Sequence, residues 1–185
     1  MKIISGGQTG VDRAALDIAL KNGIEAGGWC PTGRLDEFGT IPERYPLKEL
    51  EDGGFAERTA QNVKDSDGTV IIYPGKLSGG TEHTFRFCVD QQRPHILINA
   101  SRTPIAEAAS SIAHFVRGNK ISTLNVAGPR QSEWPAGYDY AFGALDAFIN
   151  AITNQSRDKP IHSAMLLPDR VERRNTPESA RQSNR

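Results

Sequence analysis

Three short segments of the chain combine glycine with hydroxyl, amide or arginine side chains, a combination suited to binding anions. They are residues 5–10 (Ser-Gly-Gly-Gln-Thr-Gly), residues 78–84 (Ser-Gly-Gly-Thr-Glu-His-Thr) and residues 128–132 (Gly-Pro-Arg-Gln-Ser). Glycine allows the backbone to approach an oxyanion closely, so that main-chain N–H groups can donate to it. The first segment has neither the spacing of the dinucleotide fingerprint nor that of the P-loop. The three segments therefore predict a phosphate or oxyanion site without defining the ligand.

The candidate binding residues are the glycines, polar side chains and arginines of these segments. They are Gly6, Gly7, Gln8, Thr9, Gly10 and Arg13 in and after the first segment, Ser78, Gly79, Gly80, Thr81 and Glu82 in the second, and Gly128 and Arg130 in the third. An arginine can hold an oxyanion with two parallel hydrogen bonds. Because each of these side chains taken alone is more often a cap or turn residue, the prediction depends on the three segments meeting.

Each segment follows an apolar run and precedes a helical pattern. The predicted strands are residues 2–4, 23–30, 68–73, 95–99 and 122–127, and the predicted helices are residues 11–22, 55–66, 85–89 with their flanks, 104–117 and 137–152. This alternation predicts an α/β fold, a Rossmann-like three-layer sandwich with a mostly parallel sheet of about five to six strands. Ligands of such sheets bind outside the carboxyl ends of the strands, where all three segments lie. Thr9 and Asp12 also have the spacing of a capping pair at the first helix.

The connection at residues 31–54 is long for a compact domain and rich in glycine, proline and charge. Such connections are often functional. It contains Arg34, Arg44 and Lys48. Two interpretations stay open: these cations reach over a ligand held by the first segment, or they pair locally on a solvated surface.

Composition indicates one cytoplasmic domain. With 185 residues, of which 37% are hydrophobic, the chain can bury one core. Cys30 and Cys88 show no disulfide pattern, which favours a reducing compartment, and no apolar run approaches the roughly 20 residues of a membrane span. A mildly acidic body argues against nucleic-acid binding. The histidines lack metal-ligand spacing, so no metal site is predicted.

We divide the chain into a Rossmann-like ligand-binding domain at residues 1–153 and a polar C-terminal tail at residues 154–185. The tail contains little apolar sequence with which to offset its ordering entropy. We therefore expect it to be flexible or to pack on a neighbouring subunit.

The sequence resembles the molybdenum carrier family, also called molybdenum cofactor carrier proteins. The matching residues are 5–13, 58–59, 62–63, 65–69, 79–81 and 125–130, and the resemblance covers residues 1–153. The family belongs to the Rossmann-like superfamily that includes the Lonely guy and lysine-decarboxylase-like nucleotide hydrolases. The resemblance implies a homodimer or homotetramer that binds and protects the molybdenum cofactor, a phosphorylated pterin with an oxo-metal centre, for storage or transfer. It implies molybdoenzymes or the cofactor-insertion machinery as partners, and it places Arg58 and Thr59 near the site.

An enzyme is the alternative: a nucleotide-binding protein similar to nucleoside-monophosphate phosphoribohydrolases. Those hydrolases carry Pro-Gly-Gly-x-Gly-Thr-x-x-Glu, whereas here the Gly-Thr is altered and Arg86 or a neighbour stands about where the acid should be. We therefore favour a carrier with no catalytic residue. Glu82 and His83 could move a proton in a hydrolase, or they could merely complement the helix dipole and face solvent. A third hypothesis is an interaction module in which aromatic side chains pack a dimer.

Overall fold

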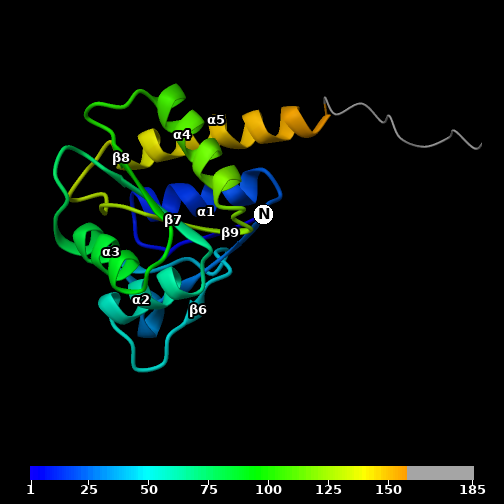
Figure 1. Cartoon of the computed structure of the whole chain (residues 1–185). Helices are drawn as coiled ribbons and strands as arrows, with labels where there is room; N and C mark the ends of the chain where they lie inside the picture. The colour runs from blue at the N-terminus through cyan, green and yellow to red at the C-terminus, as the bar shows by residue number, and fades with distance from the viewer. Residues whose placement is uncertain (158–185) are drawn as a thin grey trace, which may run out of the picture.

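Five strands form one all-parallel sheet at the centre of the computed structural model, which describes residues 1–157 (Figure 1). The strand order is β2 (Glu25–Gly27), β1 (Lys2–Ile4), β9 (Thr123–Ala127), β7 (Gly68–Tyr73) and β8 (His95–Asn99). From β1 the chain moves outward to β2, and from β7 it moves outward to β8 on the opposite side. The strand order therefore reverses around β9, and the carboxyl ends of β1, β9 and β7 share one edge.

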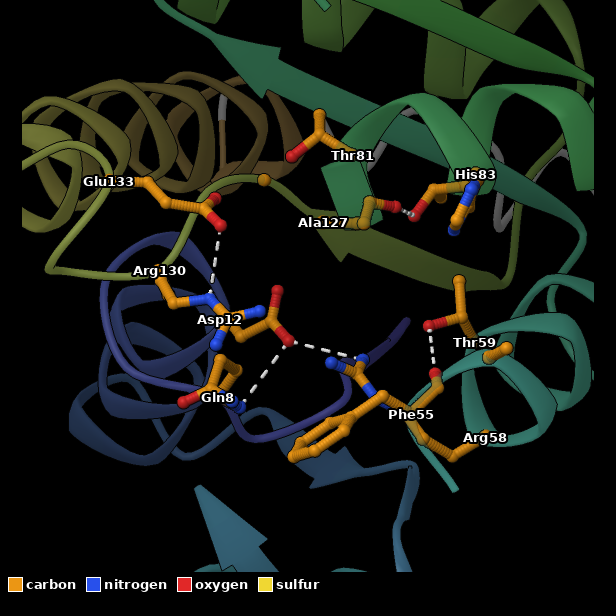
Figure 2. A pocket seen from close by; sticks show the side chains of 14 residues that line it. Gln8, Asp12, Phe55, Arg58, Thr59, Thr81, His83, Ala127, Arg130 and Glu133 are labelled. Atoms are coloured by element: carbon orange, nitrogen blue, oxygen red, sulfur yellow. Dashed lines mark hydrogen bonds and ion pairs between the residues drawn. The ribbon is translucent and has the colours of Figure 1, made fainter. Parts of the chain in front are cut away.

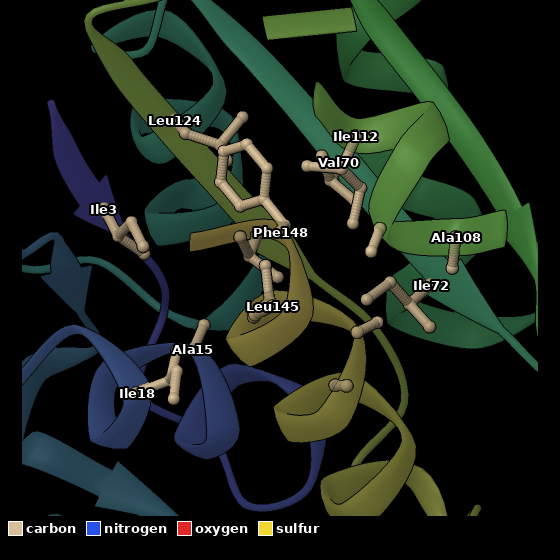
Figure 3. Packing of buried hydrophobic residues seen from close by; sticks show 14 of the residues in the cluster. Ile3, Ala15, Ile18, Val70, Ile72, Ala108, Ile112, Leu124, Leu145 and Phe148 are labelled. Carbon is tan, nitrogen blue, oxygen red and sulfur yellow. The ribbon is translucent and has the colours of Figure 1, made fainter. Parts of the chain in front are cut away.

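Helices cover both faces of this sheet. On one face α1 (Val11–Lys21), α4 (Ile105–Gly118) and α5 (Gly137–Arg157) pack together, and on the other α2 (Phe55–Lys64) packs against α3 (Gly79–Asp90). Side chains alternate along a strand, so Val70 and Ile72 enter the first core (Figure 3) whereas Ile71 enters the second. The predicted Rossmann-like three-layer sandwich is confirmed.

The predicted single strand at residues 23–30 is wrong. It divides at Gly28 into β2 and β3 (Trp29–Cys30), and β3 pairs with β6 (Lys48–Glu49) outside the central sheet. Gly28 has φ +127°, and a Cβ there would lie 2.1 Å from the Ser5 carbonyl oxygen. The backbone must therefore turn at this residue to pass the first loop.

Residues 31–54 are more structured than the predicted loop. They hold η1 (Thr32–Arg34), the antiparallel pair β4 (Leu35–Asp36) and β5 (Gly39–Thr40), and β6. A small core of their own, including Ile41, Tyr45 and Leu47, packs against Leu16 and Cys30.

The other element bounds follow the sequence closely. The strands at 68–73 and 95–99 are confirmed, while α5 continues to Arg157, beyond the predicted end. The predicted capping pair is wrong, because Gly10 is the N-cap of α1 and the Thr9 hydroxyl donates to Glu37 instead. Most of the predicted tail, residues 158–185, lies outside the described residues. Within residues 1–157, the structure contains no helix with the length and apolar character needed to cross a membrane.

The packing of α5 gives a stability prediction. Leu145 is fully buried in the first core, so Leu145→Ala should lower the free energy of unfolding by about 2–5 kcal/mol through lost burial and a residual cavity. Leu20 in α1 is 41% exposed, and Leu20→Ala should cost only about 0.5 kcal/mol. Urea unfolding followed by circular dichroism measures both. Equal losses would contradict this account of the core.

Candidate functional site

A cavity of about 80 Å³ lies at the carboxyl edge of the sheet, between the loops after β1 and β9 and the starts of α2 and α3 (Figure 2). Its lining residues are Gln8, Asp12, Phe55, Ala56, Arg58, Thr59, Gly80, Thr81, His83, Thr84, Ala127, Gly128, Arg130 and Glu133. A water molecule needs about 10–15 Å³ on this measure. The cavity thus has room for several water molecules or for one tetrahedral oxyanion, and it is too small to enclose a whole nucleotide or pterin.

Gln8 presents an amide donor to this cavity. Its Oε1 accepts hydrogen bonds from the backbone N–H groups of Thr9 and Glu37, both at 3.0 Å. The side chain is buried, and within residues 1–157 its Nε2 has no hydrogen-bond partner. The two bonds to Oε1 fix the amide orientation, and they leave Nε2 as a buried, unpartnered donor of a residue that lines the cavity.

Thr81 supplies a second group, at the start of α3. The residue is 3% exposed, and its Oγ1 has no partner among the described residues. The N-cap residue, Ser78, makes no side-chain capping bond. The first amides of a helix lack intrahelical acceptors and form the positive end of its dipole. The α3 start therefore adds backbone donors beside the Thr81 hydroxyl.

A buried ion pair borders the same space. Arg58 Nη1 lies 3.3 Å from Asp12 Oδ2, with the two side chains 12% and 3% exposed. Asp12 also accepts from the Gln8 N–H at 3.4 Å. Burial raises the pKa of the Asp12 carboxyl, although the Arg58 guanidinium opposes this shift. In the described part of the chain, Nε of Arg58 is a further buried donor without a partner.

The cavity therefore collects donors that require an acceptor. Leaving a buried donor unpaired costs about 1–3 kcal/mol. Gln8, Arg58 and Thr81 all line this one cavity, and among the described residues each has a buried polar atom without a partner. Arg130 and Glu133 complete the rim as a pair at 3.1 Å. An oxyanion, whose oxygens are all acceptors, matches this set of donors.

The structure brings part of the predicted site together. Gln8, Gly80, Thr81, Gly128 and Arg130 line the cavity. The remaining candidates do not: Gly6, Gly7, Thr9, Gly10, Arg13, Ser78, Gly79 and Glu82 lie outside its lining. The cavity thus draws on all three glycine segments, although on fewer of their residues than the sequence suggests.

The candidate residues that do not line the cavity have structural roles beside it. A Cβ at Gly6 would lie 1.4 Å from Arg58 Nη1, and one at Gly10 would lie 2.6 Å from the Pro129 carbonyl oxygen. These glycines therefore allow close packing around the site. Arg13 pairs with Asp36 at 2.8 Å, outside the cavity.

Glu82 forms an ion pair on the surface of α3. Its carboxylate pairs with Arg86 one turn along the helix, at 2.6 Å. Glu82 therefore does not take the place of a catalytic acid in the cavity. His83, in contrast, lines the cavity and is exposed.

The cations of residues 31–54 pair locally. Arg34 donates to backbone carbonyls of its own loop, Arg44 donates to the Tyr45 hydroxyl at 2.6 Å, and the Lys48 ammonium lies over the Trp29 ring. The interpretation that they reach over the ligand is wrong. An acid of this loop does reach the site region: Glu37 accepts hydrogen bonds from the Thr9 and Ser132 hydroxyls.

The sequence did not indicate four of the lining residues: Phe55, Ala56, Ala127 and Glu133. The start of α2 was predictable, but its position beside the start of α3 depends on how the two helices pack. Arg58 and Thr59 line the cavity, as the family resemblance implied. Cys30 and Cys88 are buried away from it, and burial raises the pKa of both thiols. No group of His, Cys, Asp or Glu suited to hold a metal occurs within residues 1–157.

Comparison with known proteins identifies relatives of the chain. A crystal structure of the "putative molybdenum carrier protein" from Syntrophus aciditrophicus SB is 45% identical, with a TM-score of 0.79, over 80% of this chain and 94% of that chain. No curated protein matches. The family model described as "Circularly permutated YpsA SLOG family" matches residues 3–149. The resemblance to molybdenum carriers is thus confirmed, and the chain belongs to the circularly permutated YpsA SLOG family.

Proposed function

We propose that this protein binds and protects the molybdenum cofactor for storage or transfer, and that the cavity holds an anionic group of that ligand. The observation that carries the proposal is the set of unpartnered buried donors on Gln8, Arg58 and Thr81. The Syntrophus relative is named as a molybdenum carrier, and this name supports a molybdenum-containing cargo. The cavity volume suits the terminal phosphate or an oxo-anion.

Each donor has a defined part in this binding. The Thr81 hydroxyl and the first α3 amides approach the anion from one side, and the Gln8 amide approaches from the loop after β1. Arg58 contributes charge while it stays paired with Asp12. Such a site binds through orientation and charge and involves no bond-breaking step.

A nucleotide is the second candidate ligand, because a nucleoside monophosphate presents the same phosphate oxygens. His83 and Asp12 line the cavity, and they are the groups that a phosphoribohydrolase would use for proton transfer. Against hydrolysis, Glu82 pairs with Arg86 on the surface and Asp12 is held by Arg58. We favour the carrier. The homo-oligomer and the cofactor-insertion partners stay predictions.

Gly80 allows a direct test of the proposed function. A Cβ at this position meets no atom within 4 Å, so a side chain there should fit without disturbing the fold. Gly80→Asp should place a carboxylate at the anion position and weaken molybdenum cofactor binding at least about tenfold. Anaerobic isothermal titration calorimetry measures this, with AMP as a parallel titrant.

Gly80→Asn is the matched control, because it has nearly the same shape without the charge. It should retain more affinity than Gly80→Asp. Equally strong cofactor binding in both variants would show that the anionic group of the cofactor does not bind in this cavity. AMP binding with ribose release, and no response to the cofactor, would replace the carrier with the hydrolase.

The position of Asp12 predicts that anion binding depends on pH. Because burial raises the pKa of Asp12, the carboxyl is neutral at low pH and becomes a repulsive charge as the pH rises through its folded-state pKa. Sulfate keeps its charge over this range, so its affinity should fall as pH rises. Asp12→Asn removes the charge but keeps a side-chain oxygen that can accept from Arg58. It should therefore tighten sulfate binding about tenfold at the high-pH end of the profile and flatten the profile.

Calorimetric titrations of sulfate at several pH values test this prediction. Asp146→Asn is the control, because Asp146 pairs with Lys21 away from the cavity. It should leave the profile unchanged. A wild-type affinity that rises with pH, or an unchanged profile in Asp12→Asn, would show that Asp12 does not face the bound anion.

A further inference from the structure

The cavity is too small to enclose a whole phosphorylated heterocycle, so part of any such ligand must lie outside it. Phe55 at the start of α2 and His83 in the second turn of α3 line the cavity, and both are exposed. Figure 2 shows their side chains projecting from these two helices at the cavity. The rim on this side therefore carries two planar rings.

Phe55 has the features of a contact surface. It is 45% exposed although it is a large apolar side chain. Among the described residues it is outside the hydrophobic clusters, and it makes no aromatic pair. Arg58, another lining residue of the cavity, follows on the same helix at the i+3 position. A ligand anchored by its anion thus meets the Phe55 ring as it leaves the cavity.

We propose that Phe55 is the stacking surface for a planar nitrogen heterocycle whose phosphate occupies the cavity. The ligand class is a phosphate monoester of a pterin or a purine. This inference rests on the proposed function, since it requires the anion site, and it adds the residue that distinguishes a heterocyclic ligand from a bare oxyanion.

A neighbouring cavity is the alternative position for the part of the ligand outside the anion cavity. It has a volume of about 190 Å³ and shares Thr81 and Glu133 with the anion cavity. Its other lining residues are Tyr73, Pro74, Lys76, Ser78 and Pro129. Its ammonium, carboxylate and hydroxyl groups suit a polar substituent, and the one aromatic ring among its lining residues, Tyr73, is half-buried whereas Phe55 is exposed. The exposed Phe55 ring, which pairs with no other ring within residues 1–157, is therefore the preferred stacking surface.

The test compares inorganic phosphate with two heterocyclic monophosphates, GMP and 6-hydroxymethylpterin phosphate, by isothermal titration calorimetry. In the wild-type protein, at least one heterocyclic probe should bind about tenfold more tightly than phosphate, because stacking of one base on an aromatic side chain is worth about that much or more. Phe55→Ala should remove this advantage and change phosphate affinity by less than about twofold. Phe55→Trp should keep the advantage.

Lys76→Gln is the control in the neighbouring cavity, and the ratio of heterocycle to phosphate affinity should not change in it. A ratio that persists in Phe55→Ala, or that disappears in Lys76→Gln instead, overturns the proposal. Phosphate binding with no gain for either heterocycle also overturns it, while leaving the anion site intact. If phosphate and both heterocycles all fail to bind, the anion site itself is wrong. Circular dichroism establishes that each variant is folded.

Discussion

The buried ion pair between Asp12 and Arg58 is the constraint on which the site depends. It joins the first turn of α1 to α2 across the loop after β1. Gly6 is necessary for this pair, because the Arg58 guanidinium occupies the space where a side chain would stand. Removing charges from water is costly unless the geometry of the pair is good. Here the pair holds α2 against the loop, and it thereby places Arg58 and Phe55 at the cavity.

A second layer of contacts positions the donors without touching the ligand. The Glu37 N–H helps to orient the Gln8 amide, and the Glu37 carboxylate accepts from Thr9 and Ser132 in the loops after β1 and β9. Residues 31–54 thus act as a support for the site. This role explains why the segment is long although its arginines and its lysine do not cover the cavity.

How far the sequence predicts the structure depends on the range of the interactions. The strand at 68–73 is predictable because a continuous apolar run is a local signal, and Gln8 and Thr81 are predictable because each lies within a glycine segment next to a helix start. Three glycines are needed because of contacts that form only in the folded chain. Gly28 lies against Ser5, Gly6 against Arg58 and Gly10 against Pro129. Phe55 is missed for the same reason, since the packing of α2 against α3 places it at the cavity. The family resemblance, rather than spacing, identifies Arg58.

A crystal structure of the protein soaked with molybdate, with anomalous scattering used to locate molybdenum, tests the central claim most directly. Molybdate is a tetrahedral oxyanion of the size that the cavity accepts. The account predicts one strong site within hydrogen-bond distance of Gln8 Nε2, Thr81 Oγ1 and the Arg58 guanidinium. Molybdate bound only at exposed arginines elsewhere, with none in the cavity, would contradict it.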